Sequence, residues 1–171
     1  PASHPEAGIN VQGPSLVRVP EWVDAPLGRY YLYFADHKGD SIRLAYADDL
    51  SGPWTMHAPG ALRIEDSHFA VEPPEVGWFE LQATRLTAWL RGIELTHSVE
   101  KELTMPHIAS PDVHVDDANQ RFVMYFHGLD DFASQSTRAA VSRDGVVFEA
   151  KPEVLGRTYL RAFEHAGATY A

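Results

Sequence analysis

Two aspartates beside predicted strands are the residues of this chain whose type and position could do chemistry. Asp36 follows the run YYLYFA, and Asp112 follows Pro111 in the segment IASPDVHV. Cleavage of a glycosidic bond needs one carboxyl group to protonate the leaving oxygen and a second to activate water or attack carbon. We therefore take Asp36 and Asp112 as the candidate catalytic carboxylates.

Three histidines and one arginine are candidates for binding the ligand. His37 follows Asp36, His107 lies upstream of the second candidate carboxylate, and His127 is expected directly after the run RFVMYF. Arg161 is expected at the start of a later strand, where its guanidinium could bind hydroxyl or carboxylate groups of a sugar. Imidazoles also suit zinc and similar ions, but no close-spaced ligand pair supports such a site. No metal and no cofactor are therefore expected.

Composition limits the classes of protein that this chain can represent. Its 171 residues are 44% hydrophobic and 22% charged, which suits one globular domain with one core. The formal net charge of −10 argues against binding nucleic-acid phosphates, because that affinity comes from clustered Lys and Arg. The absence of cysteine excludes disulfides and a catalytic thiol. No apolar run reaches the roughly 18 residues of a membrane span, so neither nucleic acid nor membrane is an expected partner.

An internal repeat organises the chain and predicts an all-β fold. The runs RYYLYFA (29–35) and RFVMYFHG (121–128) are predicted strands, because aromatic and β-branched residues favour strands and turn residues bound both runs. Matching residues recur in the same order: Pro14-Ser15-Leu16 with Pro111-Asp112-Val113, Tyr33-Phe34 with Tyr125-Phe126, Arg43 and Ala45 with Arg138 and Ala140, and Trp54 with Phe148. A third copy begins within residues 158–171, and its spacing from the second is close to the roughly 40–50 residues of a propeller blade.

The repeat predicts a single partial β-propeller domain over residues 1–171. The expected parts are blade one at about 9–70, a helical insertion at about 73–103, blade two at about 106–155 and the start of blade three at about 157–171. Inner strands are expected near Pro14–Val19, Pro111–Val115 and Leu160–Phe163. An incomplete ring leaves a strand edge exposed. We therefore expect these residues to belong to a chain of roughly 300, or copies to associate and close the ring.

The insertion is predicted to be helical because apolar residues recur in it at spacings of three and four. The stripe contains Phe79, Ala83, Leu86, Leu90 and Ile93, and it is widened by Trp78, Leu81 and Trp89. One interpretation is a helix packed against the propeller with no role in chemistry. The other is a partner helix or a lid over the substrate cleft. Self-association through this insertion, or through the open propeller edge, is the corresponding partner hypothesis.

The chain resembles a known group of enzymes over most of its length. The segments NVQGPSLVRVP, GRYYLYFADHKGDSIRLAYADDLSGPW and HIASPDVHVDDANQRFVMYFHG are similar to the first two blades of five-bladed propeller glycoside hydrolases related to families 43 and 32. This resemblance implies a sugar bound in the central funnel. Family 43 enzymes carry an Asp directly before the Pro of the first inner strand as general base, and this chain has Gly13 before Pro14. Asp112 matches an aspartate outside the family's three catalytic carboxylates, and the general acid belongs to later blades.

Two functions follow from these observations. The first is a glycoside hydrolase acting on a sugar in the funnel, and the alternative is a non-catalytic carbohydrate-binding or assembly module on the same fold. The candidate residues also have structural interpretations. Asp112 could accept backbone hydrogen bonds at a strand start, His107 and His127 could be hydrogen-bonded between blades, and Arg161 could pair with a carboxylate of a neighbouring blade. Three aspartate pairs are expected in turns or loops instead: Asp48-Asp49, Asp116-Asp117 and Asp130-Asp131.

Overall fold

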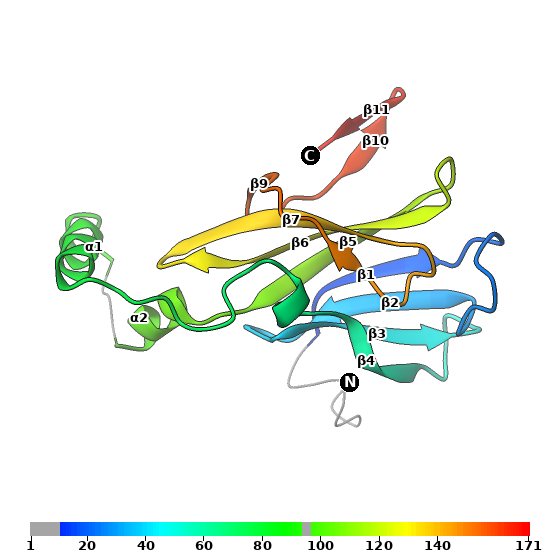
Figure 1. Cartoon of the computed structure of the whole chain (residues 1–171), viewed down its shortest axis with the longest axis horizontal. Coiled ribbons are helices and arrows are strands. Elements are labelled where there is room, and N and C mark those ends of the chain that lie inside the picture. Colours follow the sequence, from blue (N-terminus) through cyan, green and yellow to red (C-terminus); the bar gives the residue numbers. More distant parts are fainter. Residues whose placement is uncertain (1–10, 94–96) are drawn as a thin grey trace.

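The computed structural model describes residues 11–93 and 97–171, which form mainly two antiparallel β-sheets (Figure 1). The first sheet has the order β1-β2-β3-β4, with strands at Gln12–Arg18, Tyr30–Ala35, Ser41–Ala47 and Thr55–Arg63. The second has the order β5-β6-β7-β8, with strands at Ile108–Asp116, Arg121–Asp131, Ser134–Ser142 and Glu149–Ala150, and β9 (Gly156–Arg157) also pairs with β7. A 3-10 turn follows β4 at Ile64–Asp66, and β10 (Phe163–His165) and β11 (Ala168–Tyr170) form a separate hairpin. The expected all-β class is confirmed, whereas the number of propeller blades stays a prediction.

The hydrophobic core lies between the two sheets. Successive residues of a strand point to opposite faces, so Tyr31 and Tyr33 of β2 turn toward the second sheet while Phe122 and Phe126 of β6 turn toward the first. The Tyr31 and Phe122 rings stack with centroids 6.4 Å apart. The Tyr33 hydroxyl donates a hydrogen bond to the carbonyl of Gly145 at 2.6 Å. Burial raises the pKa of Tyr33 well above its ordinary value, so this hydroxyl stays protonated and satisfied within the core.

The residues matched in the sequence repeat occupy equivalent positions in the two sheets. Four opposed pairs show this: Ser15 with Tyr33 and Phe34 with Arg43 in the first sheet, and Asp112 with Tyr125 and Phe126 with Arg138 in the second. Strand register fixes which face each side chain occupies. The repeat therefore gives matched residues the same register, and because the two sheets are stacked, Tyr33 faces the core whereas Tyr125 faces away from it.

The inner strands β1 and β5 meet at two β-bulges. Their pairing with the next strand is irregular just before Ser15 in β1 and just before Asp112 in β5. Gly13 and Ser110, at these bulges, have left-handed φ angles of 55° and 53°. A Cβ atom on Gly13 would lie 2.5 Å from the Cα of Ser110, and the Ser15 hydroxyl accepts a hydrogen bond from the N–H of Val113 at 2.9 Å. Glycine is required at position 13 because the two backbones touch there.

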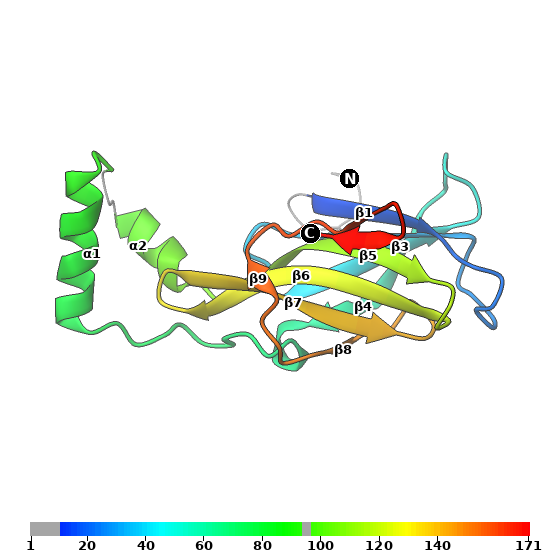
Figure 2. The same ribbon diagram turned by 90° about the horizontal axis from the view of Figure 1, so that it is seen from above.

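A helical segment projects from one end of the sheets (Figures 1 and 2). The insertion expected over 73–103 contains two helices, α1 at Trp78–Leu90 and α2 at His97–Thr104. Residues 73–77 are not helical, because two prolines and Gly77 precede α1 and proline supplies no N–H to a helix interior. Residues 94–96 of the insertion, and residues 9 and 10 of the expected first blade, lie outside the described residues. No helix within 11–93 and 97–171 is long and apolar enough to cross a membrane.

Helix α1 turns its large apolar side chains toward solvent. Trp78, Phe79 and Trp89 are 66%, 82% and 73% exposed, and Ala88 is the buried residue of this helix. The interpretation in which this stripe packs against the sheets is therefore wrong. The reason is that an extended run carries the helix away from the sheets, so no strand lies beneath the stripe (Figure 2). An association surface requires exposed apolar side chains such as these, and self-association of the protein through α1 stays a prediction.

Several polar residues lie at other positions relative to the strand ends than the sequence analysis predicted. His127 was expected at the end of the strand predicted over 121–128, and Asp130 and Asp131 were expected in a loop, but β6 extends through Asp131. The strand is longer because it keeps pairing with β7 across an irregularity near its end. Arg161 was expected to open an inner strand, but β10 begins only at Phe163. Arg161 instead lies in the segment that crosses the second sheet before β10.

We predict that Trp89→Asp leaves the free energy of unfolding within about 0.5 kcal/mol of the wild type, because the indole is already in water. The matched control is Trp22→Asp. Trp22 packs against the core with its ring 5.4 Å from that of Phe122 and donates to Asp117 at 2.7 Å. We expect this variant to lose roughly 2–4 kcal/mol. Urea unfolding followed by circular dichroism measures both, and equal losses would contradict the exposed placement of α1.

Candidate functional site

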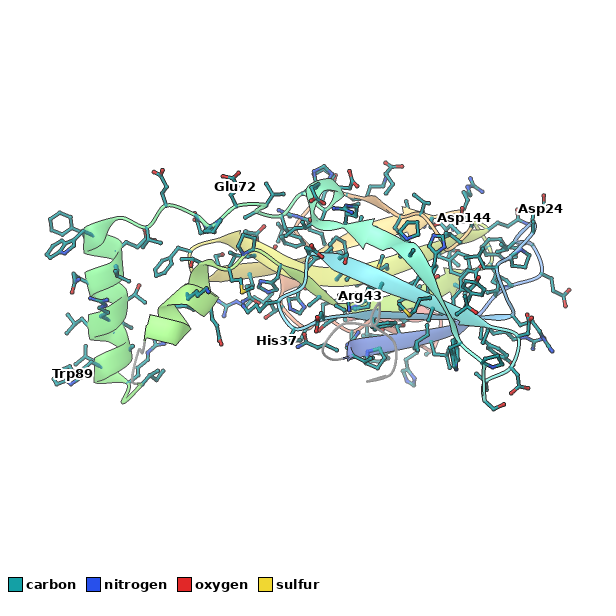
Figure 3. The ribbon with its side chains drawn as sticks, turned by 90° about the horizontal axis from the view of Figure 1, so that it is seen from below. Asp24, His37, Arg43, Glu72, Trp89 and Asp144 are labelled. Atoms are coloured by element: carbon teal, nitrogen blue, oxygen red, sulfur yellow. The ribbon has the colours of Figure 1, made fainter. Side chains whose placement is uncertain are left out.

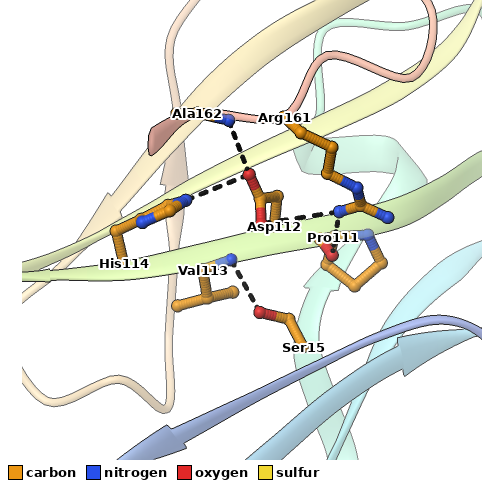
Figure 4. Close-up of polar contacts among 7 residues, drawn as sticks. All are labelled: Ser15, Pro111, Asp112, Val113, His114, Arg161 and Ala162. Carbon is orange, nitrogen blue, oxygen red and sulfur yellow. Dashed lines mark hydrogen bonds and ion pairs between the residues drawn. The ribbon is translucent and has the colours of Figure 1, made fainter. Parts of the chain in front are cut away.

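The candidate site lies on the face of the second sheet that points away from the core. Strand alternation places Asp112 and His114 of β5, and Tyr125 and His127 of β6, on this face. The chain then returns across the same face before β10, which brings Arg161 over the strands (Figure 4). The sheet therefore supplies a rigid floor, and residues near 160 form part of the opposite wall.

Asp112 holds the returning segment against β5 (Figure 4). Its Oδ2 accepts hydrogen bonds from the backbone N–H of Ala162 at 2.9 Å and from His114 Nε2 at 3.0 Å. Its Oδ1 faces Arg161 Nη1 at 3.6 Å, and that nitrogen also donates to the carbonyl of Pro111 at 2.9 Å. We call these five residues the Asp112 clamp. A carboxylate with both oxygens engaged serves first to fix the backbone around it.

Two buried histidines, His107 and His127, lie further along this face. Their ring centroids are 5.9 Å apart with the planes nearly perpendicular, and the His127 ring lies 4.7 Å from that of Tyr159. His107 Nδ1 donates to the carbonyl of Met105 at 2.8 Å, because a carbonyl oxygen can only accept. His127 Nδ1 is buried, and no hydrogen-bond partner for it exists in the described part of the chain. His127 can therefore offer a hydrogen-bonding nitrogen to a ligand.

Both histidines are neutral at pH 7. Burial lowers the pKa of His127 to about 4, and the positive charges of Lys38 and Arg161, together with that of His107 when it is protonated, act in the same direction. Burial also lowers the pKa of His107, with further contributions from Lys38 and His37. A neutral imidazole carries one donor and one acceptor nitrogen. Because His107 already hydrogen-bonds to Met105 and Gln135, His127 is the ring of this pair that is suited to a hydroxyl group, which can donate and accept.

The turn between β2 and β3 closes this end of the site. The carbonyl of Gly39 accepts a hydrogen bond from the N–H of Ile108 at 3.0 Å, which sets His37 beside the buried histidines. Asp36 accepts from the N–H of His37 at 3.1 Å and faces Arg43 Nη2 at 3.7 Å. The two carboxylates proposed as catalytic therefore engage different cations on different sheets.

A cavity of about 680 Å³ opens beside the Asp112 clamp. Polar and aromatic side chains line it, among them His114, Asp116, Arg121, Tyr125 and Phe163. This volume falls in the range of roughly 300–1,000 Å³ typical of small-molecule sites. Sequence analysis missed all five residues. For two of them, His114 and Tyr125, the sequence held a signal. Each lies two residues along a strand from a candidate residue, Asp112 or His127, and therefore on the same face.

The groups on this face can form hydrogen bonds and ring contacts with a ligand. In residues 11–93 and 97–171 no three His, Asp or Glu side chains are placed together to hold a metal ion. The site offers imidazoles, two guanidinium groups from Arg121 and Arg161, aromatic rings and the carboxylates of Asp116 and Asp117. Rings present flat apolar surfaces, and the polar groups provide hydrogen bonds of fixed direction. A ligand with both hydroxyl groups and apolar ring faces matches this set.

The comparison with curated sequences finds an uncharacterized relative. No protein-family model matches the chain. An uncharacterized protein of Acanthamoeba polyphaga mimivirus is 32% identical over 173 residues, which is 95% of this chain and 41% of the viral protein. The chain thus spans about two fifths of that relative's length.

Solved structures show what fold the chain has. A family 43 β-xylosidase/α-arabinofuranosidase from a compost microbial metagenome, solved with xylotriose, matches with a TM-score of 0.58 at 15% identity over 95% of this chain and 42% of the enzyme. An N-acetylgalactosamine deacetylase from F. plautii matches at a TM-score of 0.43 and 15% identity over 81% of this chain and 29% of its own. The chain therefore has a fold like that of part of a family 43 glycoside hydrolase.

We predict that the stability of the protein falls as the pH is lowered from about 6.5 to about 4, in part through His127. The pKa of this group is lower in the folded than in the unfolded state, so the unfolded chain takes up the proton first in this window. The expected contribution is roughly 2–3 kcal/mol, with little further loss below pH 4. His127→Gln should remove that contribution, whereas His57→Gln in β4 should not. Urea unfolding at pH 7 and pH 4.5 measures the difference, and identical pH dependence of wild type and His127→Gln would contradict it.

We also predict that Asp112→Ala loosens the returning segment without unfolding the sheets. Loss of the carboxylate leaves the N–H of Ala162 without its acceptor and removes the partner of Arg161, which costs roughly 1–3 kcal/mol locally. Amide hydrogen exchange at Ala162 should accelerate, while exchange in β6 stays slow. The control is Asp48→Ala, at an exposed turn of the first sheet. Unchanged protection of Ala162 in Asp112→Ala would show that the clamp does not hold this segment.

Proposed function

We propose that this chain is a carbohydrate-binding domain, and that the cavity beside the Asp112 clamp binds a neutral oligosaccharide. The fold resembles that of part of a glycoside hydrolase, and the cavity is lined by the rings of Tyr125 and Phe163, the imidazole of His114, the guanidinium of Arg121 and the carboxylates of Asp116 and Asp117. We also propose that the two sheets are the first two blades of a five-bladed ring, with β10 and β11 beginning the third. The matching register of the two sheets supports that proposal.

The single observation that favours binding over hydrolysis is the contact at Gly13. The resembling enzymes place their general base directly before the first inner-strand proline, which is the position of Gly13 here. A side chain requires a Cβ atom, and that atom would lie 2.5 Å from the Cα of Ser110. A carboxylate at this position would therefore force β1 and β5 apart. We infer that the residues of this chain supply no general base at that place.

The chemistry of the cavity favours an uncharged sugar as the ligand. The formal net charge of −10 disfavours polyanions, whereas a neutral oligosaccharide meets no long-range repulsion. Tyr125 and Phe163 provide ring surfaces in the cavity, and the guanidinium of Arg121, whose Nε already donates to Asp116 at 2.8 Å, provides further N–H donors. Xylotriose is a suitable first probe because it is the sugar bound in the similar hydrolase.

The alternative function is a glycoside hydrolase whose general acid lies in other parts of a longer protein. The similarity to the β-xylosidase/α-arabinofuranosidase favours it, and in that case Asp112 and Asp36 would be candidate carboxylates. Hydrolysis requires an acid and a second carboxylate about 5 Å apart for retention or roughly 6.5–9.5 Å apart for inversion. The cations that face Asp36 and Asp112 favour the binding function.

We predict that xylotriose binds the chain and that Tyr125→Ala weakens binding by about tenfold or more, which corresponds to about 1.4 kcal/mol. Tyr30→Ala in β2 is the matched control and should bind as the wild type does. Isothermal titration calorimetry measures both, in parallel with a turnover assay on aryl xylosides and arabinofuranosides. We expect no turnover. Turnover that Asp112→Asn abolishes would support the hydrolase instead, and equal binding by the two tyrosine variants would place the sugar elsewhere.

A further inference from the structure

Arg43 of β3 carries a buried cationic group that lacks a full set of partners. Its Nη1 atom is buried and makes no hydrogen bond within the described residues, while its Nη2 reaches Asp36 only at 3.7 Å. The side chain is 22% exposed and lies on the face of the first sheet away from the core, near the turn that holds His37 (Figure 3). A buried guanidinium N–H without an acceptor is costly, so this geometry calls for an acceptor.

The repeat provides an internal comparison for this arginine. Arg138 occupies the equivalent register position in the second sheet, and both of its terminal nitrogens are paired. Nη2 donates to Asp130 at 2.7 Å, and Nη1 donates to the carbonyl of Pro152 at 3.0 Å. The same residue type in the same register thus has both terminal nitrogens paired in one sheet, where only its Nε lacks a partner among the described residues, and an open Nη1 in the other. The missing group beside Arg43 corresponds to an oxygen acceptor.

A small cavity lies where that acceptor belongs. It has a volume of about 100 Å³ and is lined by Arg43, His57 and Arg63 together with Ser41 and Asp40. The irregular pairing of β3 with β4 forms one wall, at Gly60, whose φ angle is 73°. A water molecule occupies about 30 Å³ of liquid, so the cavity has room for a carboxylate or phosphate head group and not for a whole sugar ring.

We propose that this cavity is a binding site for a small oxyanion, the carboxylate or phosphate group of a larger ligand or a free ion of the same kind. Arg43 Nη1 donates the central hydrogen bond, and Arg63 and His57 lie on the adjacent walls. Charge-assisted hydrogen bonds from a guanidinium to an oxyanion are stronger than neutral ones. Asp40 on the rim and the overall negative charge limit the site to a compact anion in direct contact with Arg43. This site is separate from the proposed sugar cavity, which belongs to the second sheet.

The test is thermal unfolding in increasing concentrations of inorganic phosphate and, separately, acetate at pH 7. A ligand that binds only the folded state raises the melting temperature in a saturable way. We expect saturation in the wild type and in Arg18→Met, whose substitution lies in β1 away from the cavity, and no saturable shift in Arg43→Met. An equal shift in wild type and Arg43→Met, or no shift in the wild type up to about 50 mM, would overturn the proposal.

A second comparison separates ligand binding from a purely structural role. Without added anion, Arg43→Met should melt no lower than the wild type, because it removes an incompletely paired charge, whereas Arg138→Met should melt lower because it leaves Asp130 unpaired. A large loss of stability in Arg43→Met would instead assign Arg43 to the fold. If Arg43→Met does not fold, phosphate titration of the wild type by amide NMR decides the question. Shifts confined to Ser41 and Gly60 support the site, and shifts spread over the surface contradict it.

The source of the oxyanion is distinguished by two further ligands. Glucuronate binding at least tenfold tighter than acetate assigns the site to a sugar acid, and glucose 6-phosphate binding at least tenfold tighter than inorganic phosphate assigns it to a phosphate ester. Equal affinities assign it to the free ion. Xylotriose titration of Arg43→Met should match the wild type, so failure of the sugar proposal and failure of the oxyanion proposal give different results.

Discussion

The approach of β1 to β5 sets the geometry on which the other features depend. At the two bulges the backbones come so close that position 13 has no room for a side chain, and the Ser15 hydroxyl bridges the strands next to this point. Fixing these strands fixes the spacing of the sheets, and with it the packing of Tyr31 on Phe122 and the reach of the Tyr33 hydroxyl to Gly145. Because β5 also carries Asp112, the same contact positions the floor of the proposed sugar site.

The polar groups on the outer face of the second sheet divide into a structural part and an open part. The carboxylate of Asp112 is engaged by a backbone amide, an imidazole and a guanidinium, so it fixes local structure. The histidine pair is kept neutral by burial and by neighbouring positive charges, and one of its nitrogens remains open. A histidine whose pKa lies near 4 is a weak general base at neutral pH, so His127 is better suited to hydrogen bonding than to proton transfer. The low pKa of His127 and the lack of room for a side chain at Gly13 therefore both support the proposed binding function.

The sequence predicted the central strands of both sheets well, because the residue alternation of each strand and the turn residues at its ends are visible within a short segment. The matched runs around Tyr33 and Tyr125 gave the strand positions, and the repeat anticipated their equivalent registers. Sequence could not reveal that β6 continues past Gly128, because that depends on pairing with β7 across an irregularity. It also could not reveal whether the helical stripe is covered, since periodicity defines an apolar face without defining what lies opposite. Sequence analysis named several residues of the candidate site. It could not name their partners, such as Ala162 for Asp112, because the returning segment brings them together only in the fold.

The projecting helices give the molecule two mechanical parts. α2 is joined to the sheets through its C-terminal end, where the carbonyl of Glu102 accepts from Lys38 and that of Leu103 accepts from the N–H of Ala133. α1 lies beyond α2 along the long axis (Figure 2). Neither hydrogen bond belongs to a strand pair of the two sheets. Regions with few buried contacts open at lower free energy than a packed core, so we expect the helical arm to open before the sheets do.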